Sequence, residues 1–140
     1  MKRLIVFAML LTSTLAFAQH RFSCRFVATD EEGKPVLSGT AYVQDDCYRL
    51  EMPSMKVWSN GKDRWTYSVN SDELLIQADD MSFLKDIDVS RSSGDSATVK
   101  WENYTIELKE IKQVEEPWSA VFFIIDPDVI GDDTIITDLR

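Results

Sequence analysis

The sequence predicts a mainly β domain in which one strongly curved antiparallel sheet forms an unclosed half-barrel, with at most one or two short helices. Apolar and polar residues alternate in short runs, as at Trp65, Tyr67 and Val69, and a period of two is typical of half-buried strands. Turn sequences rich in Asn, Gly, Ser and Asp separate these runs. A twisted sheet of roughly nine or ten such strands curls rather than staying flat.

The first half of the chain is expected to begin with two strands. Residues 21–29 form the first, and residues 30–35 are a polar turn. Residues 38–52 form one long second strand, which Asp45-Asp46 interrupts as an exposed edge or a bulge. Pro53 ends this strand, because proline cannot donate to a ladder.

The central stretch, residues 48–78, is predicted to be an antiparallel meander. Its turns are Ser59-Asn60-Gly61-Lys62 and Val69-Asn70-Ser71-Asp72, because Asn and Gly tolerate the positive φ of tight hairpins. After the second turn, Leu74 and Ile76 resume the apolar face.

The second half contains the one predicted helix, two turns at residues 79–85, which Asp79 or Asp80 caps. A short strand near Ile87 follows, and then a hairpin whose turn is Glu102-Asn103. The continuous apolar run AVFFII, residues 120–125, is expected to be a strand buried on both sides. Residues 134–137 form the last strand.

One face of the predicted sheet gathers large apolar side chains that either line a ligand-binding hollow or fill a plain core. Cavity-lining and core-lining residues have the same composition, so both interpretations stand. The candidate ligand-binding residues are Phe22, Phe26, Tyr42, Tyr48, Leu50, Met52, Trp65, Tyr67, Leu74, Ile76, Phe83, Trp101, Tyr104 and Ile106.

The N-terminus is predicted to be a secretory signal peptide, residues 1–18. Lys2 and Arg3 precede an apolar run that is too short for a membrane span, and cleavage is expected after Ala18. Residues 19–140 then form a single domain with its own core. Without Lys2 and Arg3, the 15 basic residues become 13 against 24 acidic ones, a net charge of −11. So acidic a surface repels phosphate backbones, which excludes nucleic acid as a partner.

Two cysteines, Cys24 and Cys47, are candidates for a structural disulfide in an exported chain. Such a bridge would stabilise the fold by roughly 3 kcal/mol in the chain-entropy model. The alternative is a catalytic thiol, which needs a basic partner, and the one histidine is His20 near the expected mature terminus.

The sequence contains no motif for catalysis. A G-x-S-x-G elbow, a P-loop and a CxxC pair are all absent, so no enzyme activity and no cofactor are predicted. The acidic cluster of Asp126, Asp128, Asp132 and Asp133 has Ile130 where a calcium loop needs an oxygen ligand, and no metal site is predicted. The pairs Asp45-Asp46 and Asp79-Asp80 are adjacent, unlike glycosidase carboxylates, which face each other across a cleft.

The central stretch resembles the outer-membrane lipoprotein carrier family, the LolA type. The residues that carry this resemblance are Ser38-Gly39, Tyr48-Arg49-Leu50-Glu51, Pro53, Ser59-Asn60-Gly61-Lys62, Trp65-Thr66-Tyr67, residues 72–76, and near the end residues 123–127 and 136–140. Asp45-Asp46 stand where the family has its lid-closing arginine, and residues 79–85 are shorter than its lid.

The resemblance implies a periplasmic, monomeric, chaperone-like carrier whose apolar concave face binds lipoprotein acyl chains or another lipid. An inner-membrane releasing transporter would supply the cargo, and an outer-membrane acceptor would receive it. The alternative is an envelope protein-interaction module with a filled core and no lipid ligand.

Overall fold

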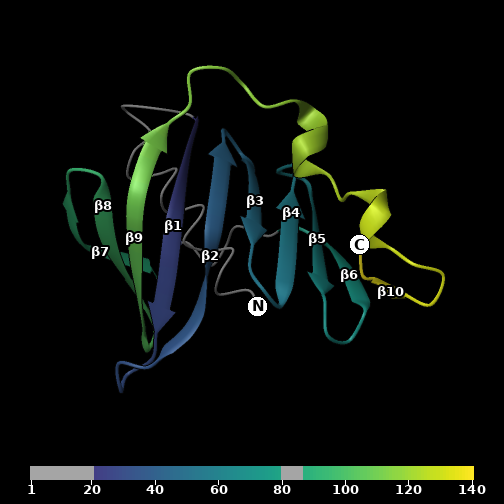
Figure 1. Cartoon of the computed structure of the whole chain (residues 1–140), viewed down its shortest axis with the longest axis horizontal. Helices are drawn as coiled ribbons and strands as arrows, with labels where there is room; N and C mark the ends of the chain where they lie inside the picture. The colour runs from purple at the N-terminus through teal and green to yellow at the C-terminus, as the bar shows by residue number, and fades with distance from the viewer. Residues whose placement is uncertain (1–20, 80–86) are drawn as a thin grey trace.

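The computed structural model describes residues 21–79 and 87–140, which form one ten-stranded sheet (Figure 1). The strand order is β10-β6-β5-β4-β3-β2-β1-β9-β8-β7, and every pairing is antiparallel except that of β10 with β6. The strands are β1 (Arg21–Thr29), β2 (Pro35–Gln44), β3 (Cys47–Glu51), β4 (Met55–Ser59), β5 (Asp63–Ser68), β6 (Glu73–Ala78), β7 (Ile87–Ser93), β8 (Ser96–Trp101), β9 (Tyr104–Gln113) and β10 (Ile135–Asp138). Two 3-10 helices lie between β9 and β10, namely η2 (Ala120–Phe123) and η3 (Pro127–Val129).

The sheet curls without closing. β10 and β7 stand at the two ends of the strand order, so each pairs on one side only among the described strands. β6 and β7 are eight strand spacings apart, which is about 38 Å on a flat sheet. The nine chain steps from Ala78 to Ile87 reach at most about 32 Å. The two ends of the sheet must therefore bend toward each other, and the predicted half-barrel is confirmed.

One face of the sheet, here called the inner face, carries the main hydrophobic core. Directly paired residues of an antiparallel sheet lie on the same face. Phe22 pairs with Val43, Val43 with Tyr48, and Tyr48 with Ser59, so one row runs across four strands. The buried core residues of this face are Phe22, Cys24, Phe26, Ala28, Ala41, Val43, Tyr48, Leu50, Met52, Met55, Val57, Ala97, Val99, Ile106 and Leu108.

The opposite, outer face is covered over β3 to β6 by the C-terminal segment, residues 114–134. Its row passes through Tyr42, Arg49, Trp58, Trp65 and Ile76. In Figure 1 the two 3-10 helices of this segment lie toward the viewer, while the β7–β8 hairpin recedes. The curl is therefore directed away from the C-terminal segment, toward the inner face.

The predicted long second strand is wrong. The structure has two strands, β2 and β3, and Asp45-Asp46 form the two-residue turn between them, with Asp45 at a φ of 52°. Gln44 pairs with Cys47 across this turn, so residues of even number on β2 face the same way as residues of odd number on β3. Tyr42 consequently lies on the outer face, opposite to Tyr48 and Leu50.

The predicted strand at residues 120–125 is also wrong. Residues Ala120–Phe123 form η2 instead, in which Phe123 is buried and Val121 is 71% exposed. An apolar run of this length does not distinguish a buried strand from a short helical segment, because neither leaves a period in so few residues. Pro117 and Pro127 flank the segment and cannot donate to a ladder.

The remaining elements follow the prediction where the structure describes them. The turns at Asn60-Gly61, at residues 69–72 and at Glu102-Asn103 are confirmed, and so is the strand near the C-terminus. The predicted helix at residues 79–85 falls outside the described residues except for Asp79. The predicted signal peptide, residues 1–18, also lies outside them.

The predicted disulfide between Cys24 and Cys47 is wrong, since both cysteines are free. Cys24 pairs with Ala41 and is buried on the inner face, whereas Cys47 pairs with Gln44 and points to the outer face. A sheet separates the two thiols, so no bridge can form without moving the backbone. Burial raises the pKa of the Cys24 thiol to about 12, which makes it a poor nucleophile.

β2 passes very close to the end of β3 at Gly39. A Cβ at this position would overlap the carbonyl oxygen of Glu51 and lie 2.8 Å from Cγ of Met52. Only glycine fits such a close approach of two strands, and glycine in a strand is typical of sharp bends. Gly39 therefore permits part of the curl.

Candidate binding site on the inner face

The inner face is apolar over β1, β2, β8 and β9. Phe22, Phe26, Ile106 and Leu108 are each less than 3% exposed. Strand register places them together, because Phe26 pairs with Leu108 and Ala28 with Ile106, and Phe22 shares the even-numbered face of β1. Aromatic and branched aliphatic side chains of this kind suit either a core or the wall of a hydrocarbon site.

The inner face becomes polar toward β4, β5 and β6. Arg64 on β5 and Asp79 after β6 have side chains that are 3% and 0% exposed, and Arg64 Nη1 lies 3.6 Å from Asp79 Oδ1. Ser59 Oγ donates a hydrogen bond to Asp79 Oδ2 at 2.5 Å, and Arg64 Nη2 donates to Gln77 Oε1 at 2.7 Å. We call Tyr48, Ser59, Arg64, Gln77 and Asp79 the inner polar cluster.

Four members of this cluster are placed by strand register. Tyr48 pairs with Ser59, Ser59 with Arg64, and Arg64 with Gln77, so they form one row across β3 to β6. Asp79 follows β6 directly and reaches this row through its side chain. The same row continues to Val43 and Phe22, so the polar cluster and the apolar wall are contiguous.

Three buried polar atoms of the cluster have no hydrogen-bond partner in the described structure. They are the Tyr48 hydroxyl, Arg64 Nε and Asp79 Oδ1. Burial raises the pKa of Tyr48, and the negative charge of Asp79 raises it further, while Arg64 and Ser59 beside it act the other way. Neither neighbour reaches hydrogen-bond geometry with that hydroxyl. An unsatisfied buried polar group costs about 1–3 kcal/mol, so the cluster is unusual.

The structure brings half of the predicted site residues together. Phe22, Phe26, Tyr48, Leu50, Met52, Tyr104 and Ile106 lie on the inner face. Tyr42, Trp65, Tyr67, Leu74 and Ile76 lie on the outer face. Phe83 is outside the described residues, and for Trp101 the structure describes only the strand position at the end of β8.

The outer-face residues have a structural role. Trp58, Tyr67 and Leu74 form a second buried cluster, against which Trp65 and Ile76 pack together with Ile125, Val129 and Ile130 of the C-terminal segment. Placing them on the same face as Tyr48 and Leu50 was therefore wrong. Each connection from β3 to β6 has an even number of residues between its closing pair, so inward-facing residues change from even to odd numbers, or back, at every turn.

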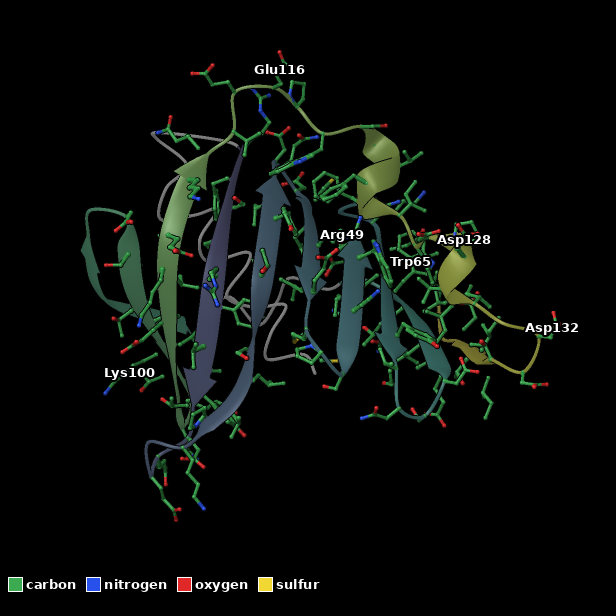
Figure 2. The ribbon with its side chains drawn as sticks, in the orientation of Figure 1. Arg49, Trp65, Lys100, Glu116, Asp128 and Asp132 are labelled. Carbon is green, nitrogen blue, oxygen red and sulfur yellow. The ribbon has the colours of Figure 1, made fainter. Side chains whose placement is uncertain are left out.

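Arg49 joins β3 to the C-terminal segment on the outer face. Its guanidinium carbon lies 4.4 Å from the centre of the Phe122 ring, and Arg49 Nη1 donates to the Phe122 carbonyl oxygen at 3.4 Å. Arg49 Nη2 also lies 2.7 Å from Glu51 Oε1. Figure 2 shows Arg49 and Trp65 beside this segment, so both side chains belong to the packing of the outer face.

The sequence reasoning missed the polar half of the inner face. The half-buried alternation at Trp65, Tyr67 and Val69 puts Arg64, Thr66 and Ser68 on the opposite face, which such a pattern leaves to solvent. Arg64 and Thr66 are instead each 3% exposed, since both faces of β5 are covered. The register that follows from the Asn60-Gly61 turn was the one signal that pointed to Arg64 beside Ser59.

A pocket of about 450 Å³ opens on the outer face between β1, β2 and β9. Arg25, Glu107, Lys109 and Glu110 stand among its lining residues, and Gly39 forms part of its floor. Its charged walls and its opening to solvent do not suit a hydrocarbon tail. The volume therefore does not count as the hollow expected on the inner face.

Within residues 21–79 and 87–140, no group of three or more His, Cys, Asp or Glu side chains is arranged to hold a metal ion. No helix in this part of the chain has the length and apolar character to cross a membrane.

Comparison with known proteins establishes the fold and no family. No family model matches the chain, and no curated protein matches it. A solved structure, described as an uncharacterized conserved protein from Thermus thermophilus, matches with a TM-score of 0.57 at 10% identity. The match covers 93% of this chain and 97% of that one. At this identity the similarity concerns the architecture alone, and it shows that the half-barrel occurs in another protein.

Proposed function

We propose that this protein is an exported, non-enzymatic carrier that shields the acyl chains of lipoproteins, or of another lipid, on the inner face of its half-barrel. The observation that carries the proposal is the grouping of aromatic and aliphatic side chains on one face of an unclosed sheet. The resemblance to the lipoprotein carrier family supplies the class of cargo, and the apolar N-terminal stretch supplies export to the periplasm.

The physical chemistry of such a carrier is simple. Each methylene removed from water contributes about 0.8 kcal/mol, so a single acyl chain can be held without any covalent bond. Release then needs a partner that offers a better apolar surface. An inner-membrane releasing transporter and an outer-membrane acceptor are the partners that this proposal requires. The acidic surface of the chain limits unproductive adsorption to anionic membrane.

The test is lipid binding by gently purified protein. We expect lipid extraction and mass spectrometry to recover an acylated molecule, and an environment-sensitive acyl probe to bind the stripped protein. Absence of both would contradict the proposal.

A matched pair of variants locates the site. Ala41 is fully buried on the inner face, and the adjacent Thr40 lies on the outer face. We expect Ala41→Phe to fold and to lose acyl binding, because the ring would take the place proposed for the acyl chain, while Thr40→Phe keeps binding. If the inner face is packed shut, Ala41→Phe instead destabilises the fold by about 1–3 kcal/mol.

The second candidate is an envelope protein-interaction module. It is favoured by the exposed apolar side chains at the C-terminal edge, where Ile135 is 58%, Ile136 53% and Leu139 62% exposed. Edge strands with exposed apolar residues pair readily with other chains. Two results together would support this function. The protein would bind no acyl probe, and it would bind a defined envelope partner that the Ile136→Lys variant no longer binds.

A further inference from the structure

The inner polar cluster is placed at one end of an apolar wall. Residues of the neighbouring row, Leu50 and Val57, are both no more than 1% exposed, and the cluster's own row continues into Val43 and Phe22. A molecule lying on this wall with its tail over β1 and β9 would bring its head to Tyr48, Ser59 and Arg64. The side chains of the cluster are also held in place, because two hydrogen bonds and one ion pair fix Arg64 and Asp79.

From this geometry we infer that the inner polar cluster is the head-group subsite of the proposed carrier, and that it takes a neutral head bearing both hydrogen-bond donors and acceptors. The inference rests on the proposed function, since it assumes an acyl tail on the inner face. The unpartnered atoms define what the head must offer. Arg64 Nε–H and the Tyr48 hydroxyl need an acceptor, and Asp79 Oδ1 needs a donor.

The charges already present in the inner polar cluster disfavour an anionic head group. Arg64 carries the positive charge of the cluster and Asp79 the negative one, and they already face each other at 3.6 Å. A carboxylate or phosphate placed here would add a second negative charge beside Asp79 Oδ1, which accepts no hydrogen bond, in a site where burial weakens solvent screening. A glycerol ester or an amide head satisfies all three atoms without adding charge.

The experiment compares ligands with one tail and different heads. Monolauroylglycerol and laurate share a dodecanoyl tail, and both are titrated against the apolar reporter N-phenylnaphthylamine at mildly alkaline pH, where laurate is ionised. We expect monolauroylglycerol to displace the reporter with at least about tenfold higher affinity than laurate, because only the neutral head can satisfy Asp79.

Tyr48→Phe and Tyr67→Phe form a matched pair, because each removes one tyrosine hydroxyl. Tyr48 is on the inner face, whereas the Tyr67 hydroxyl donates to Asp72 near the β5–β6 turn. We expect Tyr48→Phe to lower the affinity for monolauroylglycerol about fivefold to tenfold and to leave the affinity for the reporter unchanged. Tyr67→Phe should change neither. Far-ultraviolet circular dichroism confirms that both variants are folded.

The outcomes separate the two proposals. If neither the reporter nor any acyl ligand binds, the carrier function fails. Two results would overturn only the head-group subsite. One is that laurate binds with the same affinity as monolauroylglycerol, and the other is that Tyr48→Phe binds both ligands with the affinities of the parent protein.

Discussion

Arg64 and Asp79 form a buried ion pair on the inner face, with Arg64 Nη1 3.6 Å from Asp79 Oδ1 and the two side chains 3% and 0% exposed. At this distance the pair is an electrostatic contact and not a hydrogen bond. Ser59 and Gln77 each satisfy one further atom of the pair. Buried pairs of this kind contribute little net stability, yet losing one member leaves an isolated buried charge.

A double-mutant cycle on this pair tests that balance. We expect Arg64→Met alone and Asp79→Asn alone each to lower the free energy of unfolding by about 3 kcal/mol, because the remaining charge is uncompensated. The double variant should lower the free energy of unfolding by clearly less than the sum of the two single-variant losses. The measurement is denaturant unfolding. Strict additivity would mean that the two charges do not interact in solution.

Gln44 holds the C-terminal segment on the outer face through two reciprocal hydrogen bonds. Its Nε2 donates to the Trp118 carbonyl oxygen at 3.0 Å, and the Trp118 backbone N–H donates to Gln44 Oε1 at 2.8 Å. Removing both hydrogen bonds should lower the free energy of local opening of this segment by about 1–3 kcal/mol. We expect Gln44→Ala to speed hydrogen exchange at the Trp118 amide and to shift tryptophan fluorescence. Gln113→Ala, on the exposed end of β9, is the control and should change neither observable.

The strands and turns were predictable because their signals are local. Alternation and Asn-Gly chemistry act within a few residues, and β4, β5 and β6 begin and end close to where those signals place them. The half-barrel was predictable for the same reason, since a meander of this many short strands curls.

The assignment of faces was not predictable from alternation alone. Asp45-Asp46 carry no glycine, so nothing distinguished a two-residue turn from an interruption within one strand, and carrying a single alternation through residues 38–52 placed Tyr42 on the wrong face. Arg64 was expected to face solvent, because the interpretation of an alternating pattern takes one face of the strand to be solvent-exposed. Burial on both faces of β5, with residues 114–134 packed on the outer one, is a tertiary property that no local pattern contains.

The two thiols give a direct check of the covalent state. Because Cys24 and Cys47 are free, the mass of the denatured protein should not change on reduction. Burial raises the pKa of Cys24 to about 12, whereas Cys47 is half-buried, with its pKa raised first by burial and then by Asp46 and Asp45. We expect a thiol reagent to modify Cys47 first and Cys24 only after unfolding. Cys47→Ser should remove the fast phase, and a mass gain of two hydrogens on reduction would contradict the structure.

Gly39 is the position where the curl is most sensitive to a side chain. A β-carbon there overlaps the backbone oxygen of Glu51, which cannot move aside as a flexible side chain can. We expect Gly39→Ala to lower the free energy of unfolding by at least about 2 kcal/mol. Gly131→Ala is the control, since its nearest neighbour would be Thr134 Oγ1 at an ordinary 3.9 Å. Equal stability of the two variants would show that β2 and β3 separate at this point.

Asp72 fastens β10 to the rest of the sheet, and its ionisation should make that attachment sensitive to acid. The Tyr67 hydroxyl donates to Asp72 Oδ1 at 2.7 Å, and Thr134 Oγ1 donates to the same oxygen at 2.8 Å. These hydrogen bonds, that of Tyr67 first, lower the pKa of Asp72 below its ordinary 3.8. A lowered pKa in the folded state means that the contribution to stability is complete above pH 3.8 and is lost as the pH falls below it.

We therefore expect Asp72→Asn to reduce thermal stability at neutral pH, and this deficit to shrink toward zero as the pH falls below the folded-state pKa of Asp72. Thermal unfolding of parent and variant across an acid series measures the difference directly. Asp132→Asn, at an exposed position in the same C-terminal region, should leave the acid profile of the parent protein unchanged. A deficit that stays constant down to the lowest pH would show that the Asp72 charge does not contribute, because protonation would then have no effect on the contact with β10.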